Sequence, residues 1–228
     1  MGGPPRSRTE GHCPLRHHDD GSESFRLDDG LDRYRRRVIR IAHVGCTAAA
    51  HHTVSNPSYH VVSFAADFDL GSFDFGEAGY NDWLTRHASA SVKAGVCAVY
   101  LLIERLPHRE RVVGYFAINP TQVVREQAPL SLSRGWPLSV PAWNLGKLAV
   151  HVDLRVDKDA QWGRQLLREA LETIVRVADV GGGKVIVVDA DNPGLLDFYT
   201  RNGFKATGND RDLSLYMKVS TARKAFNS

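Results

Sequence analysis

Hydrophobic residues from position 59 onward fall into short β-type runs that are separated by helical or polar segments. Runs rich in β-branched and aromatic residues predict strands; they cover residues 60–66, 96–104, 111–119, 143–151, 184–190 and 213–219. The second and third runs flank RLPHRE, which favours a hairpin. The fifth run is almost wholly apolar, as expected of a strand that is buried on both faces of a sheet.

Three helices are predicted between these strands. Asp74 followed by Glu77 is a capping-box pattern and predicts a helix that begins at Asp74. Apolar positions between Leu166 and Val175 recur at helical spacing, which predicts an amphipathic helix of about five turns. The segment DNPGLLDFYTR at 191–201 predicts a short helix with a proline at its first position.

The order of these elements predicts one α/β domain of the α+β kind, with a mixed central sheet flanked by helices, over residues 59–220. Residues 1–58 are rich in arginine, histidine and acidic residues and contain no lysine. Their lack of apolar periodicity predicts a disordered or poorly structured tail, because such a segment cannot bury enough apolar area to offset its ordering entropy. Residues 221–228 are expected to be a short C-terminal tail.

A basic run, RYRRRVIRIA at 33–42, stands out in the N-terminal tail. Its arginines at 33, 36, 37 and 40 recur at three and four residues, so a helix here would carry one positive face that could meet nucleic acid. A solvated or disordered basic run explains the same pattern more simply. Both interpretations stay open at this point.

Composition excludes several classes of protein. The chain of 228 residues is 43% hydrophobic and carries a formal net charge of +3, which is ordinary for a globular protein. It has no apolar stretch of about 18 residues that could span a bilayer, and its N-terminus lacks the order of a secretory signal. Three scattered cysteines provide no disulfide framework. We therefore expect a cytoplasmic protein without a membrane partner.

No metal site is expected. Cys13 lies near His12, His17 and His18, but a second ligand pair at zinc-finger spacing is missing. Cys97 lies within an apolar run and is expected to be a small buried hydrophobic residue.

The strand–turn–long helix at 143–178 is the strongest local candidate for ligand binding. The N-terminus of a helix offers backbone N–H groups without intrahelical acceptors, and the helix dipole favours an anion there. The turn contains Gly163, which permits close approach, and Arg164, which adds positive charge. A single glycine is a weak phosphate signal, so an ordinary strand-to-helix loop explains these residues equally well.

Several sequence blocks resemble the GNAT acetyltransferase superfamily. LGKLAVH, WGRQLLREAL and VDADNPGLLDFYTRNGF are similar to its acetyl-CoA core, in the family's order. FDFGEAGYNDWLTRHA, VPAWNLGKLAV and the FY…GF ending resemble the toxin acetyltransferases encoded beside ribbon-helix-helix antitoxins. The resemblance covers residues 62–219. It implies a GNAT-like fold and acetyl-CoA as the acyl donor.

The resemblance also implies where the donor binds. Leu148, Ala149 and Val150 would form the strand whose backbone pairs with the pantetheine arm. The family's pyrophosphate signature is Arg/Gln-x-x-Gly-x-Gly/Ala. In the register that keeps the helix phase, Lys158 takes the first position, Gln161 the inner glycine position and Gly163 the last. The neighbouring Trp162 and Arg164 then belong to the same loop.

A second register of the pyrophosphate signature starts at Arg155, with Lys158 at the inner position and Ala160 last. Neither register restores the inner glycine. A Cβ there would block the approach of the backbone to a phosphate or demand a rearranged loop. Arg155, Lys158 and Arg164 could supply charge where a backbone contact is lost. We prefer the first register.

The short helix at 191–201 would form the far wall of the site. In the resemblance, Tyr199 matches a general acid that protonates the departing thiolate, and Asn192 matches a residue that contacts the donor. Adjacent helical positions lie about 100° apart. We therefore expect Phe198 and Tyr199 to face different ways, with Phe198 packed in the core at the edge of the donor site and Tyr199 toward the cleft. Core packing is the alternative for Tyr199.

No general base has a spacing that singles it out. Glu104, His151, Asp153 and Asp157 are possible by residue type, and a water chain would also suffice. His151 at a strand end is expected to lie at the surface or rim. The oxyanion would be stabilised by backbone N–H groups of the strand at 148–150.

We therefore predict an acyl-CoA-dependent N-acetyltransferase that acts on a primary amine. The toxin-like blocks favour the α-amine of aminoacyl-tRNA, and a small-molecule amine or a protein N-terminus remains open because fold does not determine substrate. A ribbon-helix-helix antitoxin and a second copy of the chain are the expected protein partners. The alternative from another class is a non-catalytic acyl-CoA-binding or regulatory module, in which the altered phosphate loop reflects lost turnover.

Overall fold

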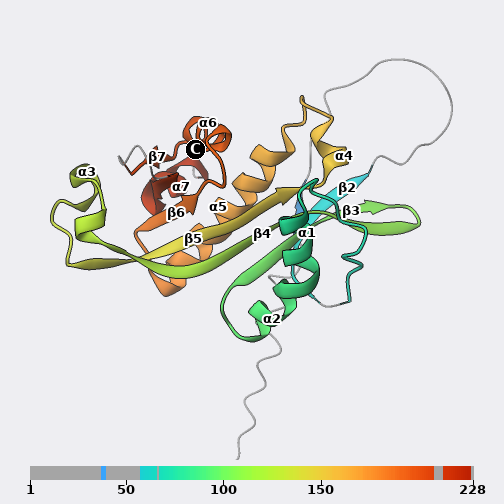
Figure 1. The fold of residues 1–228 in the computed structure, drawn as a ribbon, viewed down its shortest axis with the longest axis horizontal. Coiled ribbons are helices and arrows are strands. Elements are labelled where there is room, and N and C mark those ends of the chain that lie inside the picture. The colour runs from blue at the N-terminus through green and yellow to red at the C-terminus, as the bar shows by residue number, and fades with distance from the viewer. Residues whose placement is uncertain (1–36, 40–56, 66, 208–212, 227–228) are drawn as a thin grey trace, which may run out of the picture. The chain divides into compact units, whose positions relative to one another are not determined.

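A computed structural model describes residues 37–39, 57–65, 67–207 and 213–226, all within a unit that spans residues 34–228. In these residues the strands form one mixed sheet in the order β1-β2-β3-β4-β5-β6-β8-β7 (Figure 1). The strands are β1 (Arg37–Ile39), β2 (Ser58–Ser63), β3 (Ala98–Leu106), β4 (Arg109–Val124), β5 (Ser139–Val150), β6 (Val185–Asp189), β7 (Lys205–Ala206) and β8 (Ser214–Lys218). Only β5 and β6 pair in parallel, whereas every other neighbouring pair is antiparallel.

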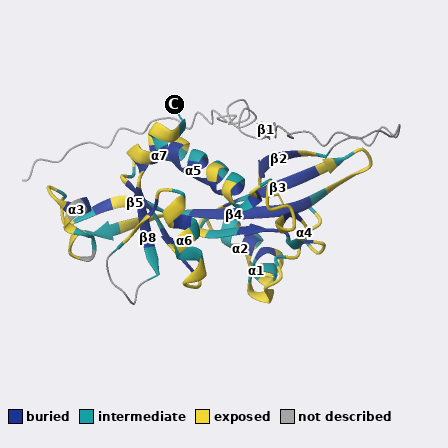
Figure 2. Ribbon diagram, turned by 90° about the horizontal axis from the view of Figure 1, so that it is seen from above, coloured by how far each residue is buried: buried dark blue, intermediate teal, exposed yellow. Residues whose placement is uncertain are grey.

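Helices cover both faces of the sheet. They are α1 (Ala78–Asp82), the π-helical turn η2 (Trp83–His87), α2 (Ala88–Lys93), the 3-10 turn η3 (Arg125–Gln127), α3 (Leu130–Ser133), α4 (Val152–Arg155), α5 (Trp162–Gly181), α6 (Gly194–Arg201) and α7 (Val219–Phe226). Figure 2 shows α5 and α7 on one face and α1 and α2 on the other. None of the helices in this part of the chain is long and apolar enough to cross a membrane.

Side chains alternate between the two faces of the sheet along each strand, so the core has one layer on each face. On β3, Leu102 packs with α5, whereas Leu101 and Ile103 pack with the helices that follow β2. The buried stripe of α5 includes Leu166 and Leu167, as its periodicity predicts. Gly114 lets these layers approach, because a Cβ there would lie 3.0 Å from the carbonyl oxygen of Ala149 and 3.3 Å from Leu166 Cδ2. The predicted mixed α/β fold is therefore confirmed.

The capping-box prediction for the first helix was wrong. The helix begins at Ala78 with Glu77 as its N-cap, and no side chain caps it. Asp74 instead accepts the backbone N–H of Gly76 at 2.7 Å and Asn81 Nδ2 at 2.9 Å, and these bonds lower its pKa. A short polar side chain satisfied by its own loop competes with helix capping, which sequence spacing alone does not reveal.

Three further elements differ from the prediction. β4 continues to Val124 and β5 begins at Ser139, so both strands extend beyond the predicted bounds of 119 and 143, and α3 lies between them. Residues 221–226 of the expected C-terminal tail belong to α7, which begins at Val219, because Val219 and Ala222 bury a face against the core. Residues 37–39 of the basic run form a strand paired with β2, so they present no helical face. The Cys13 cluster and the rest of the basic run lie outside the described residues.

Candidate active site

The two parallel strands at the centre of the sheet separate part-way along their length. β5 pairs with β6 only from Ala142 to Asn144, although β5 continues to Val150. Gly146 is the extra residue of a bulge opposite β4, where Ala117 pairs with Lys147 and Ile118 with Leu145. From Leu145 onward β5 therefore has a strand partner on one side alone. Its other edge can accept an extended ligand by backbone pairing.

A cavity of about 190 Å³ fills the gap between the separating strands. Its apolar walls include Leu148 and Val150 from β5, Val188 from β6, and Leu195 and Phe198 from α6. Charged and phenolic groups also line it: Tyr80, Lys147, Arg155, Asp189, Asp191 and Tyr199. A mostly apolar cavity with a few convergent polar groups is the usual form of a small-ligand site.

The side chain of Tyr199 forms part of the wall of this cavity. Its side chain is 6% exposed, and its ring centroid lies 5.5 Å from that of Phe204. Burial, followed by the negative charge of Asp191, raises the pKa of Tyr199 to about 12. The phenol is therefore protonated at neutral pH and can donate to an anion that develops in the cavity.

Phe198 and Tyr199 do not face different ways, with Phe198 in the core and Tyr199 toward the cleft, as was predicted. Both line the cavity, and Tyr199 is the more deeply buried of the two. Their ring centroids are 5.1 Å apart with planes at 71°, an edge-to-face arrangement that lets one helix turn present both rings. The prediction was wrong because it considered the direction of each Cβ without the reach of an aromatic ring.

A second cavity, of about 540 Å³, lies at the N-terminus of α5. It shares Arg155, Gly163 and Phe198 with the first cavity. Its other lining residues include Asp157, Lys158, Gln161, Trp162, Arg164 and Arg201. Four cations and the free N–H groups at the start of a 20-residue helix converge here, so this cavity suits a phosphorylated ligand.

Gln161 has a left-handed backbone conformation, which glycine adopts more readily than other residues. It is the N-cap of α5 with φ 47° and ψ 46°, and among the described non-glycine residues it alone has a positive φ. Asp157 Oδ1 accepts the backbone N–H groups of Asp159 at 3.1 Å and Ala160 at 3.0 Å. These two N–H groups are thereby occupied. The first register, with Gln161 at the inner position, agrees with both observations.

Trp162 has its ring in the core. The centroid lies 4.2 Å from that of Tyr59, and the residue is 5% exposed. Its backbone N–H at the first position of α5 is the group that can meet a phosphate. Gly163 faces Phe198, since a Cβ there would lie 3.6 Å from Phe198 Cε2, an ordinary contact.

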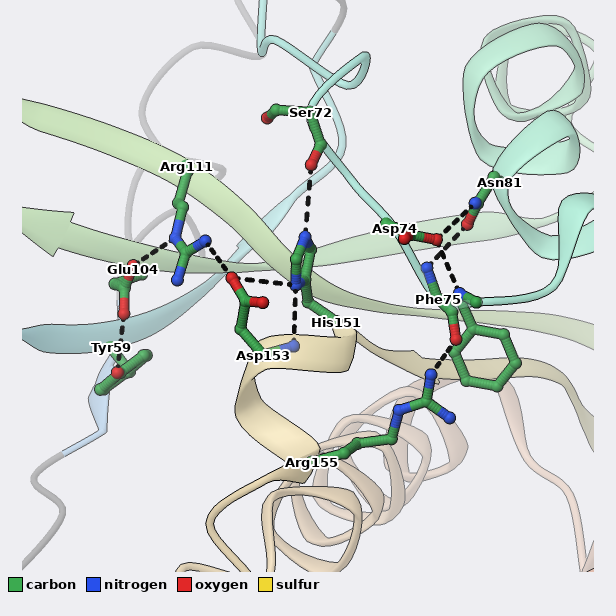
Figure 3. A network of polar contacts seen from close by, with 11 residues as sticks. Tyr59, Ser72, Asp74, Phe75, Asn81, Glu104, Arg111, His151, Asp153 and Arg155 are labelled. Atoms are coloured by element: carbon green, nitrogen blue, oxygen red, sulfur yellow. Dashed lines mark hydrogen bonds and ion pairs between the residues drawn. The ribbon is translucent and has the colours of Figure 1, made fainter.

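The four candidate bases are engaged elsewhere. Figure 3 shows Arg111 between Glu104 and Asp153, and the Tyr59 hydroxyl donates to Glu104 Oε1 at 2.8 Å. Arg111 holds the pKa of Asp153 below its usual range. The fourth candidate, Asp157, is held by the loop before α5, as described above.

His151 is buried, which contradicts its predicted place at the rim. It is 7% exposed, and its Nδ1 accepts the backbone N–H of Asp153 at 3.1 Å. Its Nε2 therefore carries the proton and donates to the carbonyl oxygen of Ser72 at 3.3 Å. This contact holds the loop before α1 against the end of β5 (Figure 3).

The same loop carries one wall of the first cavity. Arg155 donates to the carbonyl oxygen of Phe75 and lies 4.5 Å from its ring centroid. Phe75 in turn packs on Tyr80 with centroids 4.4 Å apart. The polar network in Figure 3 therefore holds Phe75 in place at the wall of the first cavity.

No protein-family model matches the chain. A tRNA-acetylating toxin of Mycobacterium tuberculosis is 30% identical over 155 residues, which are 68% of this chain and 89% of the relative. The chain belongs to this family of GNAT-fold toxin acetyltransferases. It is accordingly an acetyltransferase, as the sequence predicted.

Solved structures share the fold. A tyrosine-to-phenylalanine mutant of KacT superposes with a TM-score of 0.67 at 20% identity, over 74% of this chain and 99% of that one. AtaT complexed with acetyl-methionyl-tRNAfMet has a TM-score of 0.65 at 24% identity, over 75% and 99% of the two chains. AtaTR bound with acetyl-CoA has a TM-score of 0.63 at 24% identity, over 74% and 98%.

Within this toxin acetyltransferase, most of the predicted donor residues come together. Leu148 and Val150 line the first cavity, Lys158, Gln161, Trp162 and Arg164 line the second, and Gly163 and Phe198 line both. Ala149 points to the opposite face of the sheet, so only its backbone can meet the donor. Asn192 is exposed at the start of α6 and lies outside the linings of these two cavities.

Phe75, Tyr80 and Asp191 are among the residues of the first cavity that sequence reasoning missed. Asp191 had a usable signal, because polar residues just after the carboxyl end of a buried strand often lie at a ligand site. Phe75 and Tyr80 had none, since aromatic residues beside a helix start are usually core. Among the described residues there is no cluster of His, Cys, Asp and Glu that could hold a metal.

Proposed function

We propose that this toxin acetyltransferase transfers the acetyl group of acetyl-CoA to the α-amine of an aminoacyl-tRNA. The observation that carries the proposal is the pair of adjoining cavities, one cationic at the start of α5 and one mostly apolar beside Tyr199. The relative from Mycobacterium tuberculosis is a tRNA-acetylating toxin, and AtaT has been seen with acetyl-methionyl-tRNAfMet. These findings favour a charged tRNA over a small-molecule amine.

The residues present fit acetyl-CoA. The free edge of β5 at Leu148 to Val150 can pair with the amides of its pantetheine arm, and the cations around α5 can meet its phosphates. In the reaction, the amine nitrogen attacks the thioester carbon, and the carbon–sulfur bond breaks. Backbone N–H groups of β5 would stabilise the oxyanion, and the phenol of Tyr199 would protonate the departing thiolate.

We further propose that an antitoxin with a ribbon-helix-helix fold neutralises the enzyme in the cytoplasm. AtaT has been seen bound to the C-terminus of the antitoxin AtaR, and KacTA has been seen with DNA. A homodimer is the expected state of the free enzyme. Co-expression with the product of a small adjacent gene, followed by size-exclusion chromatography with light scattering, tests both assemblies.

Thiol release from acetyl-CoA tests the activity. The purified chain is supplied with charged tRNA, uncharged tRNA or a panel of simple amines. We expect thiol release and an N-acetylated aminoacyl group with charged tRNA alone. Release with simple amines but not with charged tRNA would contradict the proposed substrate. Binding of acetyl-CoA without release on any amine would instead support the non-catalytic module.

A further inference from the structure

A carboxylate next to Tyr199 has no role in the acetyl transfer described so far. Asp191 follows β6 in the turn before α6 and lines the first cavity. The hydroxyl of Tyr80 on α1 donates a hydrogen bond to Asp191 Oδ2, although the two residues are 111 positions apart in the chain. The contact therefore links the two walls of the cavity, one from α1 and one from the segment before α6.

Tyr80 is itself held in place. The Tyr115 hydroxyl donates to its carbonyl oxygen at 3.0 Å, the Phe75 ring packs on it, and Lys147 Nζ lies 4.6 Å from its ring centroid. Burial and then the hydrogen bond to Asp191 raise the pKa of Tyr80, so its hydroxyl remains a donor at neutral pH. One carboxylate oxygen of Asp191 is thus oriented, and the carboxylate retains further acceptor positions for a ligand.

The other charged groups around this cavity make contacts within its walls. Asp189 accepts a hydrogen bond from Ser214 Oγ at 2.5 Å. Arg155 donates to the carbonyl oxygen of Phe75, and Lys147 lies over the ring of Tyr80. Asp191 is in addition the charge that acts on the phenol of Tyr199. A cation that binds Asp191 is therefore placed beside the group that faces the leaving thiolate.

We propose that Asp191, held by Tyr80, binds the ammonium group of the acceptor and selects amines that carry no neighbouring carboxylate. The inference rests on the proposed function and names the chemistry by which its acceptor is recognised. An aminoacyl ester presents an ammonium beside a neutral ester, whereas a free amino acid presents an ammonium beside a carboxylate. The carboxylates of Asp189 and Asp191 attract the ammonium group, but they repel the carboxylate of a free amino acid.

The protons balance in this arrangement. The acceptor nitrogen loses two protons as the ammonium becomes an amide. One passes to Asp191 and from there to solvent, which frees the lone pair that forms the new carbon–nitrogen bond. The second proton leaves the nitrogen when the carbon–sulfur bond breaks. It returns to the phenol oxygen of Tyr199, which has given its own proton to the sulfur. The products are the N-acetyl amide, the free thiol of CoA and one proton.

Steady-state kinetics with aminoacyl-tRNA test the role of Asp191. We expect Asp191→Asn to lower kcat/KM at least tenfold, mainly through KM, with an unchanged Kd for acetyl-CoA by isothermal titration. Tyr80→Phe keeps the ring and loses the hydrogen bond, so it should cause a smaller rise in KM. Asp197→Asn is the matched control: Asp197 lies on α6, 82% of its side chain is exposed, and its partner is Arg201. It should behave as the unchanged enzyme.

A competition assay tests the selectivity. The competitors are the amino acid carried by the best-acetylated tRNA and the amide of that amino acid. The amide should inhibit the unchanged enzyme more strongly than the free amino acid, and Asp191→Asn should narrow this difference. An unchanged kcat/KM in Asp191→Asn would overturn the inference while the activity of the unchanged enzyme stands. An unchanged enzyme that acetylates no amine would overturn the proposed function instead.

If Asp191→Asn also weakens acetyl-CoA binding or lowers the melting temperature, Asp191→Glu decides the matter. The longer carboxylate should then recover at least part of kcat/KM for aminoacyl-tRNA. Failure to recover any of it would assign Asp191 a purely structural role and overturn the inference.

Discussion

Replacing Gln161 by glycine and by alanine measures the cost of the unusual start of α5. At φ 47° and ψ 46°, an L-residue is disfavoured by roughly 1–2 kcal/mol relative to the right-handed conformation, whereas glycine adopts both readily. The unfolded chain is more flexible with glycine than with alanine at this position, and this offsets about 0.4–1 kcal/mol of the stability that glycine gains. Gln161→Gly should therefore be more stable than Gln161→Ala by about 1 kcal/mol. Both variants lose the same hydrogen bond to Arg164, so the comparison isolates the backbone.

Thermal unfolding checks the difference. For a domain of this size, 1 kcal/mol corresponds to roughly 2–4 °C in Tm. Arg168 lies exposed in the right-handed part of the same helix and provides the inverse control, because Arg168→Ala should there be more stable than Arg168→Gly by about 1 kcal/mol. If Gln161→Ala equalled or exceeded Gln161→Gly in Tm, the left-handed conformation at this position would be refuted.

The same pair of variants bears on the donor. Gln161 lines the phosphate cavity, and Gln161→Gly keeps the backbone conformation while it removes the side chain. We expect acetyl-CoA to bind Gln161→Gly as tightly as the unchanged protein or more tightly. A weaker affinity by isothermal titration would show that the glutamine side chain itself contacts the donor.

Three further predictions follow from the buried polar groups. Tyr199→Phe should lower kcat by about 10²–10⁴-fold with little change in the Kd of acetyl-CoA, and equal turnover would exclude Tyr199 as the acid. Because the pKa of Tyr199 is raised to about 12 in the folded state, its contribution to stability is present below pH 10. About 3 kcal/mol should be lost as pH rises from 10 to 12, a loss that is absent from Tyr199→Phe in alkaline denaturation. Arg111→Met leaves Glu104, which is 5% exposed, without its cationic partner and should cost about 3 kcal/mol in chemical denaturation. Arg105→Met breaks the exposed pair with Glu110 and should cost less than about 1 kcal/mol, so equal losses would contradict the burial argument.

Much of the fold was predictable because it depends on local periodicity. The β-branched runs became strands, and the apolar stripe of α5 became its buried face, since each pattern matches the repeat of its backbone. The predicted bounds of the helices and strands were less accurate than their order. Asp74 was mistaken for a helix cap because its hydrogen bonds go to a loop amide and to Asn81, both of which depend on the loop conformation.

The candidate site was likewise predictable only in part from the sequence. The sequence by itself determined the order of the elements, the family to which they belong and the segment that carries Tyr199, because these depend on residues close together in the chain. The tertiary structure alone decided that β5 and β6 separate after Asn144, that Gln161 adopts a left-handed conformation and that Tyr80 meets Asp191. Such contacts join residues far apart in the chain, and the packing of the whole sheet and its helices determines them.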